Sequence, residues 1–258
     1  MEVKIHLYAI CWNEAKILPH FLRYYNEICE KIFIYDNFST DRSLEIISGF
    51  SKTEIFSFYT NNQIRDDVYI KIKNEAWKKS RGKCDFVIVC DVYEFIFHPD
   101  FNNFFKSLKE QNVSLAICEG FNMISKDYPG EEDSIFTKIQ EGVRATDFDK
   151  LIVFDPNLIE EIYYTLGAHE CMPIGKLKFN NYELKLLHYK YLSLPDVLSR
   201  YKEMGRRLSK YNKRLKLGHH YLFSSGRIKR EFEAIWKNKI NEFNKIEGEP
   251  FTHPEKLQ

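Results

Sequence analysis

Polar residues follow three short apolar segments in the first half of the chain, each where the segment ends. Amide and carboxylate oxygens can accept hydrogen bonds from ribose hydroxyls or bind a divalent cation. Asp91 and Glu94 form the densest group, because two acids directly follow an almost wholly apolar run. The full set is Asn13 and Glu14 after residues 5–10, Asp36 and Asn37 at the end of residues 31–36, and Asp91 and Glu94 at the end of residues 85–91.

Strand and helix patterns alternate through this half, and they must position those side chains. A short helix is expected to begin at a cap on Ser39 or Thr40 and to end near Gly49. The alternation predicts an α/β fold with a doubly wound parallel sheet, whose strands present ligand sites at their carboxyl ends. The expected strands are residues 5–10, 31–36, 53–59, 85–91 and 113–121, and the longer expected helices are residues 15–29, 66–80 and 101–110.

The pattern loosens in the second half of the chain. Residues 125–149 are polar and are expected to form a long loop or a hairpin, and strand patterns return at residues 151–154 and 184–191. From residue 195 the chain reads as helices rich in Lys and Arg. We therefore divide it into residues 1–120, residues 121–194 of the same domain, and a helical region at residues 195–258.

Composition narrows the class of protein. The 38 Lys and Arg residues nearly balance the 37 Asp and Glu residues, so we expect no nucleic-acid partner. Six cysteines without a C-x-x-C pair are typical of buried, reduced thiols. The start MEVKIHLYAI lacks the features of a signal peptide, and the apolar run at residues 86–97 is too short to span a bilayer. We expect a cytoplasmic protein.

Neither the dinucleotide fingerprint G-x-G-x-x-G nor the phosphate-binding G-x-x-x-x-G-K-[ST] occurs in the sequence. If the chain binds a phosphorylated ligand, it must hold the phosphates in another way. Two alternatives are a divalent cation on the strand-end carboxylates and direct contact with basic side chains.

Several segments together resemble the family-2 glycosyltransferases. AICWNEAKILPHFLRYY and IFIYDNFSTDRS look like the opening of that family, and CDFVIVCDVYEFIFH looks like the branch with a D-x-D-E-F motif. GAH (residues 167–169) and LLHYKYL (residues 186–192) look like later motifs of the same branch. The resemblance covers roughly residues 5–221. It implies a GT-A fold, which is a Rossmann-like, mostly parallel sheet flanked by helices, here with a helical, basic C-terminal portion.

The resemblance also implies roles for individual residues. The donor would be a nucleoside-diphosphate sugar bound by residues 1–120, with residues 121–194 on the acceptor side. Asn13, Glu14, Asp36 and Asn37 would contact the nucleotide base and ribose; Arg65, Asp66 and Asn74 would border the donor; Asp91 would lie near the ribose and the metal, Glu94 beside the sugar, and His188 at the metal or pyrophosphate.

Transfer also needs a counter-charge for the leaving diphosphate and a base for the acceptor hydroxyl. His188, Lys190 and Arg200 are candidates for the counter-charge besides a metal, while His169, Glu170, Glu119 and Asp127 are candidates for the base. We assign the catalytic roles to Asp91, Glu94 and His169. Arg200, Glu203 and Arg207 share a helix face, and they either reach the site or form a network in solvent.

One residue departs from the family pattern. Tyr93 stands where the motif has its second Asp, the main metal ligand of the family. A phenol is a poor ligand for Mn²⁺ or Mg²⁺. Three interpretations stay open: a metal held by Asp91, Glu94 and His188 with water, a metal-independent enzyme that uses Lys or Arg, and a chain without catalysis.

The leading hypothesis is transfer of a sugar, with a UDP-sugar favoured as donor, to a glycan or lipid-linked acceptor of a surface polysaccharide or lipooligosaccharide. The resembling motifs are those of inverting enzymes. One alternative is a nucleotide-sugar-binding protein without catalysis, which Tyr93 supports. A nucleotidyltransferase is less favoured, because CWNEAKILP lacks the glycines of a nucleotide loop. The basic C-terminal helices either contact anionic lipid headgroups at the membrane face or keep their charges in water.

Overall fold

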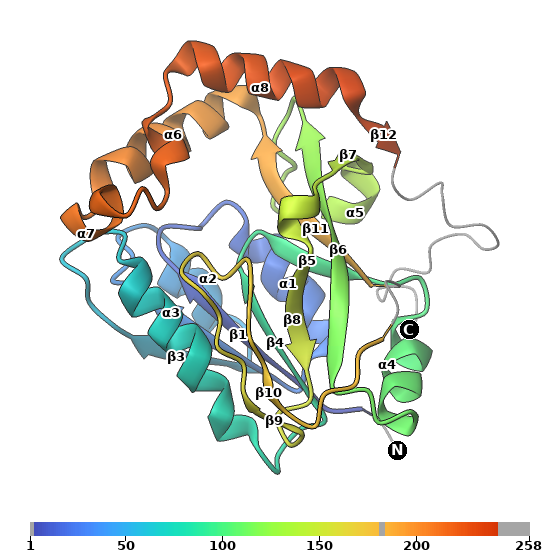
Figure 1. The fold of residues 1–258 in the computed structure, drawn as a ribbon. Helices are drawn as coiled ribbons and strands as arrows, with labels where there is room; N and C mark the ends of the chain where they lie inside the picture. Colours follow the sequence, from blue (N-terminus) through green and yellow to red (C-terminus); the bar gives the residue numbers. More distant parts are fainter. Residues whose placement is uncertain (1–2, 181–183, 242–258) are drawn as a thin grey trace.

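The computed structural model describes residues 3–180 and 184–241 (Figure 1). The strands are β1 (Ile5–Cys11), β2 (Lys31–Asp36), β3 (Thr53–Ser57), β4 (Phe86–Asp91), β5 (Glu94–Phe97), β6 (Leu115–Ser125), β7 (Glu141–Arg144), β8 (Lys150–Phe154), β9 (Ile159–Glu161), β10 (Ile174–Gly175), β11 (Leu184–Leu192) and β12 (Ile240–Asn241). The α-helices are α1 (Leu18–Ile28), α2 (Ser43–Ser48), α3 (Asp66–Glu75), α4 (Phe101–Glu110), α5 (Ile135–Lys138), α6 (Leu194–Arg207), α7 (Lys210–Arg214) and α8 (Ser225–Asn238). Short 3₁₀ turns are η1 (Ala76–Ser80), η2 (Thr146–Phe148) and η3 (His219–Leu222).

One large sheet organises the chain, with the strand order β12-β7-β6-β8-β4-β1-β2-β3. Strands β3, β2, β1 and β4 are parallel, and β1 lies between β2 and β4, so the order reverses there. Strand β8 runs antiparallel to both β4 and β6, while β11 runs parallel to β6. The α/β class with a Rossmann-like parallel part is therefore confirmed.

Helices cover both faces of the parallel part, because its central strands are apolar on both sides. On one face, Leu7 and Ala9 of β1 pack with Phe21 and Leu22 of α1. On the other face, Tyr8 and the strands beside it pack with the fully buried Trp77 of η1. The strands are thus held rigidly, and so are the residues at their ends.

The C-terminal helices form a second layer over one end of the sheet. Figure 1 shows α6 and α8 across the top of the molecule, close to the ends of β6 and β11. Val197 and Tyr201 of α6 and Phe232 of α8 share an apolar cluster with Ile124 and Tyr191 of those strands. The helical character predicted from residue 195 is seen as far as Asn238, where α8 ends, whereas Ile240–Asn241 form the short strand β12. The remainder of the predicted region lies outside the described residues.

Several predicted boundaries are wrong for reasons of local hydrogen bonding. Helix α1 begins at Leu18 rather than at residue 15, and α2 begins at Ser43 rather than at a cap on Ser39 or Thr40. The Ser39 hydroxyl instead donates to Asp36 and accepts from the Asn13 amide, which ties two strand ends together. The predicted helix at residues 66–80 ends as α3 at Glu75 and continues as the 3₁₀ turn η1.

The sheet is less uniformly parallel than the strand–helix alternation predicts. Residues 125–149 are not one loop, because they contain α5, β7 and η2. Strand β7 pairs antiparallel with β6, which agrees with the predicted alternative of a hairpin. Strand β5 was not predicted, because only two residues separate it from the end of β4 at Asp91 and the sequence pattern shows no break between the two strands. No helix among residues 3–180 and 184–241 is both long enough and apolar enough to cross a membrane. All six cysteines are free thiols, and five of them are buried.

Candidate active site

A cavity of about 230 Å³ lies at the carboxyl ends of β1 and β4. This is the place where ligands bind in an open α/β sheet, because the strand order reverses there and leaves a crevice. Helix α3 supplies one wall with Asp66, Tyr69, Ile70 and Lys73, which lie on one face of the helix at spacings of three and four residues. The other walls come from β11, from the turn between β4 and β5, from residues 167–169, from α6 and from η3.

Three of the four acidic groups of the cavity are paired with basic side chains. Asp91 contacts Lys73 at 2.8 Å, and Glu94 contacts Lys150 at 2.5 Å. The third pair joins Glu14 at the end of β1 to Arg200 of α6. The carboxylates that the sequence placed at the sheet edge are therefore already neutralised within the protein.

Two of these carboxyls have opposite pKa shifts. Burial raises the pKa of Glu14 to about 7, although Arg200 opposes this change. Burial acts in the same direction on Glu94, but Lys150 and Lys73 outweigh it and hold the pKa of Glu94 below its ordinary value. At neutral pH, Glu94 is thus a buried anion with its own counter-ion, whereas Glu14 titrates near the working range of a general base.

The basic groups of the cavity outnumber the acidic groups, and two have no acidic partner among the described residues. They are Lys190 of β11 and Arg207 of α6. The Lys190 ammonium contacts Nε2 of His220 at 3.4 Å and lies over the rings of Tyr201 and Tyr221. Burial lowers the pKa of Lys190, and it lowers the pKa of Arg207 to about 10. The cavity therefore carries uncompensated positive charge.

His188 is held in place by its neighbours. Its Nδ1 lies 2.9 Å from Oδ1 of Asn122, and its ring lies 4.2 Å from the ring of Phe148. Tyr93 contacts the same imidazole edge-on at 5.1 Å. Burial and the nearby Lys190 lower the pKa of His188 well below its ordinary value, so the imidazole is neutral at pH 7.

His169 projects to the cavity from the loop that follows β9. Its Nδ1 lies 2.9 Å from the backbone oxygen of Asp147. A carbonyl oxygen can only accept, so in this contact Nδ1 is the protonated nitrogen and Nε2 of the neutral ring has a free lone pair. This arrangement suits a general base.

Not every predicted site residue reaches the cavity. Asp36 is buried and accepts from the amide and hydroxyl of Ser39, and Asn37 is buried between Thr60 and Tyr69. Arg65 pairs with Asp67. Asn74 binds the backbone of Tyr164 through both ends of its amide, which fixes the segment that leads to His169. The predicted residues that line the cavity are Glu14, Asp66, Asp91, Glu94, His169, His188, Lys190 and Arg200.

Sequence reasoning left out several residues that line the cavity, including Lys73, Lys150, Trp12 and Tyr221. Lys73 could have been found, because it lies seven residues after Asp66 on the same helix face. Lys150 carries no such signal, since its partner Glu94 lies 56 positions earlier. The alternative of a network in solvent for Arg200 and Arg207 does not fit, because both line the cavity and Arg207 is buried.

A second cavity of about 360 Å³ adjoins the first. It is lined by Asn13, Tyr128 and Tyr189, among others. Five residues line both cavities: Glu14, Tyr93, Lys190, Arg200 and Tyr221. The site therefore consists of two compartments that share a wall of aromatic and charged side chains.

The donor set does not fit a divalent cation. Lys73 and Lys150 occupy the carboxylates of Asp91 and Glu94, and burial raises the pKa of the Tyr93 phenol well above its ordinary value. Within the described part of the chain, no three His, Cys, Asp or Glu side chains are grouped closely enough to hold a metal ion. A cation at this place would have to displace two buried lysines.

Comparison with known proteins gives the following. No family model matches the sequence, and no curated protein matches it. Two crystal structures of S. aureus TarS are similar in fold. The first is 13% identical, with a TM-score of 0.46, and the match covers 78% of this chain and 38% of that chain. The second, TarS 1-349, is 12% identical, with a TM-score of 0.43, and the match covers 78% of this chain and 63% of that chain. The chain thus spans less than two thirds of the length of these structures.

Gly120 determines how closely η2 approaches β6. A Cβ atom at Gly120 would lie 2.5 Å from the backbone carbonyl carbon of Phe148, whose ring packs on His188. We expect Gly120→Ala to lower the free energy of unfolding by about 1–3 kcal/mol through overpacking. Gly226→Ala is the control, because a Cβ there comes no closer than 3.7 Å to a neighbour. Equal urea midpoints for the two variants would contradict the prediction.

Proposed function

We propose that the chain is a glycosyltransferase that moves a sugar from a nucleoside-diphosphate sugar, with UDP-sugars favoured, to a glycan or lipid-linked acceptor of a surface polysaccharide or lipooligosaccharide. The supporting observation is the two-compartment site at the carboxyl ends of β1 and β4. The first compartment combines a strand-end acid, Asp91, with uncompensated positive charge. These features suit a ribose and a diphosphate, respectively.

The acceptor is assigned to the second compartment. Tyr128, Tyr189 and Tyr221 give it aromatic walls, and such rings pack against the apolar faces of sugars while their hydroxyls form hydrogen bonds. Because Tyr93 and Glu14 line both compartments, an acceptor hydroxyl and the anomeric carbon of a donor would meet beside them.

The proposed reaction is a single displacement with inversion. The acceptor oxygen forms a bond to the anomeric carbon, and the bond from that carbon to the diphosphate oxygen breaks with its electron pair on the diphosphate. His169 lines the first compartment, and its Nε2 receives the proton of the acceptor hydroxyl as that hydroxyl enters from the second compartment. Nε2 is the free nitrogen because Nδ1 is bound to the Asp147 carbonyl. The positive charge of the cavity stabilises the leaving diphosphate.

Nucleotide binding provides the first test. We expect UDP at about 100 times its dissociation constant to raise the melting temperature by about 5 °C or more, since binding to the folded state adds about 2.7 kcal/mol. GDP and CDP serve as competitors, and release of UDP from UDP-sugars in the presence of candidate acceptors measures transfer. If none of the three nucleotides stabilises the fold, the proposal fails. Stabilisation without release from any UDP-sugar would favour a nucleotide-sugar-binding protein.

A further inference from the structure

Arg207 lies in a setting that an arginine rarely occupies without an anion. Its side chain is buried, and its guanidinium lies 3.1 Å from the ring centroid of Trp12. Nε donates to the backbone and side-chain oxygens of Asn62, and Nη1 contacts the sulfur of Met204 at 3.6 Å. Nη2 is buried and has no hydrogen-bond partner within the described residues. Leaving a charged donor buried and unpaired costs free energy, which a bound anion would recover.

Lys190 is the second such group in the same cavity. Its ammonium is bordered by the rings of Tyr201 and Tyr221 and by the imidazole of His220, none of which carries a negative charge. Burial and the nearby Lys190 lower the pKa of His220 to about 3, so this imidazole is neutral and accepts from Lys190 at pH 7. Lys190 and Arg207 come from β11 and α6, which the apolar cluster between the sheet and the C-terminal helices holds together.

The remaining charges around these two groups do not form ion pairs with them. Glu231 attracts Lys190 and Glu203 attracts Arg207 from a distance, but among the described residues neither carboxylate lies within 4 Å of the cation. Asp91, Glu94 and Glu14 have Lys73, Lys150 and Arg200 as partners. The fourth acid, Asp66, lies beside Asn212 at the start of α3, and burial raises its pKa. Five Lys and Arg side chains and four carboxyl groups line the cavity, and Lys190 and Arg207 are the two cations without an ion-pair partner among the described residues. These two are available to bind a ligand with negative charge.

We propose that Arg207 and Lys190 bind the diphosphate of the ligand directly and take the place of a divalent cation. This inference rests on the proposed function for the identity of the ligand, but the anion site itself rests on the contacts above. In a metal-dependent site, the strand-end acids hold the cation that binds the phosphates. In this chain the acids and the phosphate-binding cations are separate groups. The acids keep their lysine partners, and the phosphates are held by side chains of α6 and β11 that line the same cavity.

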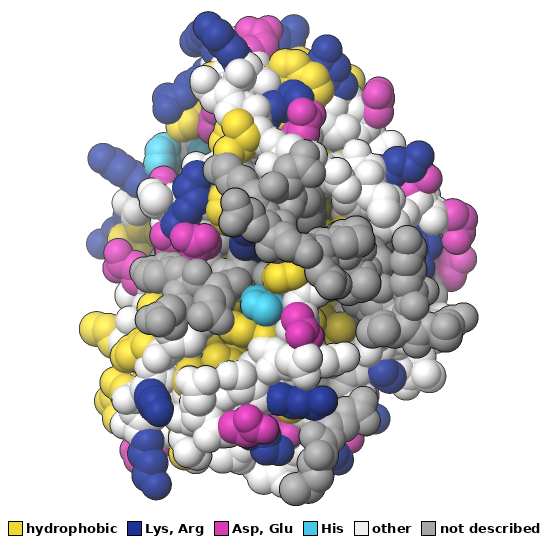
Figure 2. Space-filling view, turned by 90° about the vertical axis from the view of Figure 1, so that its right-hand side faces the viewer, with side chains coloured by type: hydrophobic (Ala, Val, Ile, Leu, Met, Phe, Trp, Pro, Cys, Tyr) yellow, Lys and Arg dark blue, Asp and Glu magenta, His cyan; other side chains and the backbone are white. Residues whose placement is uncertain are grey.

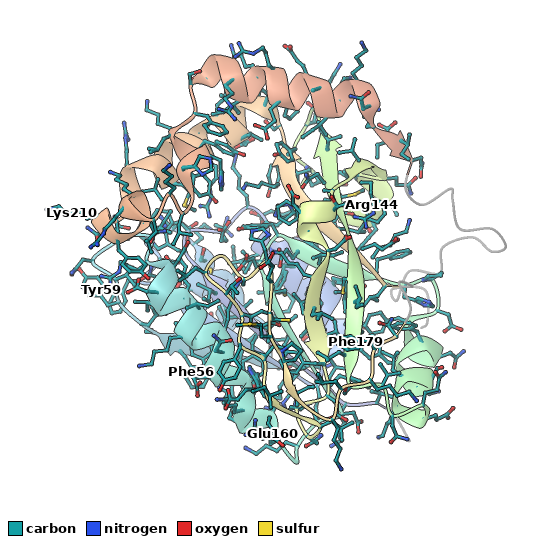
Figure 3. All side chains as sticks on the ribbon, in the orientation of Figure 1. Phe56, Tyr59, Arg144, Glu160, Phe179 and Lys210 are labelled. Carbon is teal, nitrogen blue, oxygen red and sulfur yellow. The ribbon has the colours of Figure 1, made fainter. Side chains whose placement is uncertain are left out.

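Calorimetric titration of the whole chain with UDP, uridine and inorganic pyrophosphate tests the proposal, each in EDTA and in Mn²⁺. We expect UDP to bind equally well in EDTA and in Mn²⁺. Arg207→Gln and Lys190→Met are each expected to weaken UDP binding about 10- to 100-fold and to leave uridine binding unchanged, because a charged hydrogen bond is lost only with the phosphates. Lys210→Gln is the matched control, since Lys210 is exposed at the outer end of α7 (Figure 3).

The outcomes separate this inference from the proposed function. UDP binding that disappears in EDTA and returns with Mn²⁺ would overturn the inference. Equal weakening of UDP binding and uridine binding in the variants would also overturn it, because that result shows a structural role of the two residues. A failure of both UDP and pyrophosphate to bind would overturn it as well. Pyrophosphate binding that both variants weaken, without any preference for a nucleotide, would support the anion site while the glycosyltransferase proposal fails. Arg207→Lys keeps the charge and is expected to retain part of the binding if Arg207→Gln folds poorly.

Discussion

Replacement of Lys150 by Met is expected to lower the free energy of unfolding by about 3–5 kcal/mol at neutral pH. Lys150 and Glu94 are both buried, with side chains 3% and 1% exposed, and their charged atoms lie 2.5 Å apart. Removing the lysine leaves a carboxylate in the interior without its nearest counter-ion. Urea denaturation, monitored by near-ultraviolet circular dichroism, measures the change in the free energy of unfolding.

The double variant Lys150→Met with Glu94→Gln is the control, because it removes both charges of the pair. We expect it to be more stable than the single variant, since replacing a whole buried pair is often close to neutral. A single variant within about 1 kcal/mol of the wild type would contradict the assignment of a stabilising contact to this pair.

The same pair predicts how stability changes with pH. The pKa of Glu94 is held below its ordinary value of 4.5, so the folded state favours the ionised carboxyl. Its contribution is complete above pH 4.5 and is lost as the pH falls through the lower pKa of the folded state. The difference in stability between the wild type and Lys150→Met should therefore shrink on acidification. A constant difference between pH 7 and pH 3 would contradict this.

Asp91→Asn is expected to weaken UDP binding and sugar transfer about 10- to 100-fold. The fold should persist, because Asp91 is partly exposed and Lys73 keeps the nearby carboxylate of Glu94. Asp91 ends the central strand β4, its side chain is 26% exposed, and it orients the Lys73 ammonium at 2.8 Å. In the proposed reaction its carboxylate accepts from a ribose hydroxyl, and an amide accepts such a bond more weakly because it has no charge.

Asp127→Asn provides the matched control. Asp127 is one of the base candidates from the sequence, but it is exposed and lines neither cavity, so its removal should not affect UDP binding. UDP and uridine should both bind less tightly to Asp91→Asn, since the ribose is common to the two ligands. This pattern differs from that of the Arg207 variant, which should affect UDP alone. If Asp91→Asn and Asp127→Asn have the same UDP affinity, the ribose contact is wrong.

Both signs of charge are present on the face of the molecule that Figure 2 shows, in agreement with the near-neutral sequence. Figure 2 shows Lys, Arg, Asp and Glu side chains interspersed over one face of the molecule. The positive charge of functional interest lies in the cavity, where Lys190 and Arg207 have no carboxylate partner among the described residues. A charge count along the chain averages these two environments and cannot distinguish them.

Elements with a local sequence pattern could be predicted from the amino-acid sequence alone. Strand β2 occupies the predicted residues 31–36, and α4 occupies the predicted residues 101–110. Strand-end residues such as Glu14 and Asp91 were found because the carboxyl ends of parallel strands meet at one edge. The strands and helices could be predicted because their patterns repeat over a few residues. The strand-end residues could be predicted because a side chain that directly follows a buried parallel strand lies at the carboxyl edge of the sheet.

Which charges are paired and which are available for a ligand depends on long-range packing, and it could not be predicted from the sequence. Glu94 meets a lysine 56 positions later, Glu14 meets an arginine 186 positions later, and Arg207 is buried although its helix reads as amphipathic and basic. The antiparallel insertion of β8 between β4 and β6 brings Lys150 to Glu94, and the packing of α6 over β11 brings Arg207 to the cavity. These partners lie far apart along the chain, so no local spacing records them, and the energy of a buried charge depends on the partner that the fold supplies.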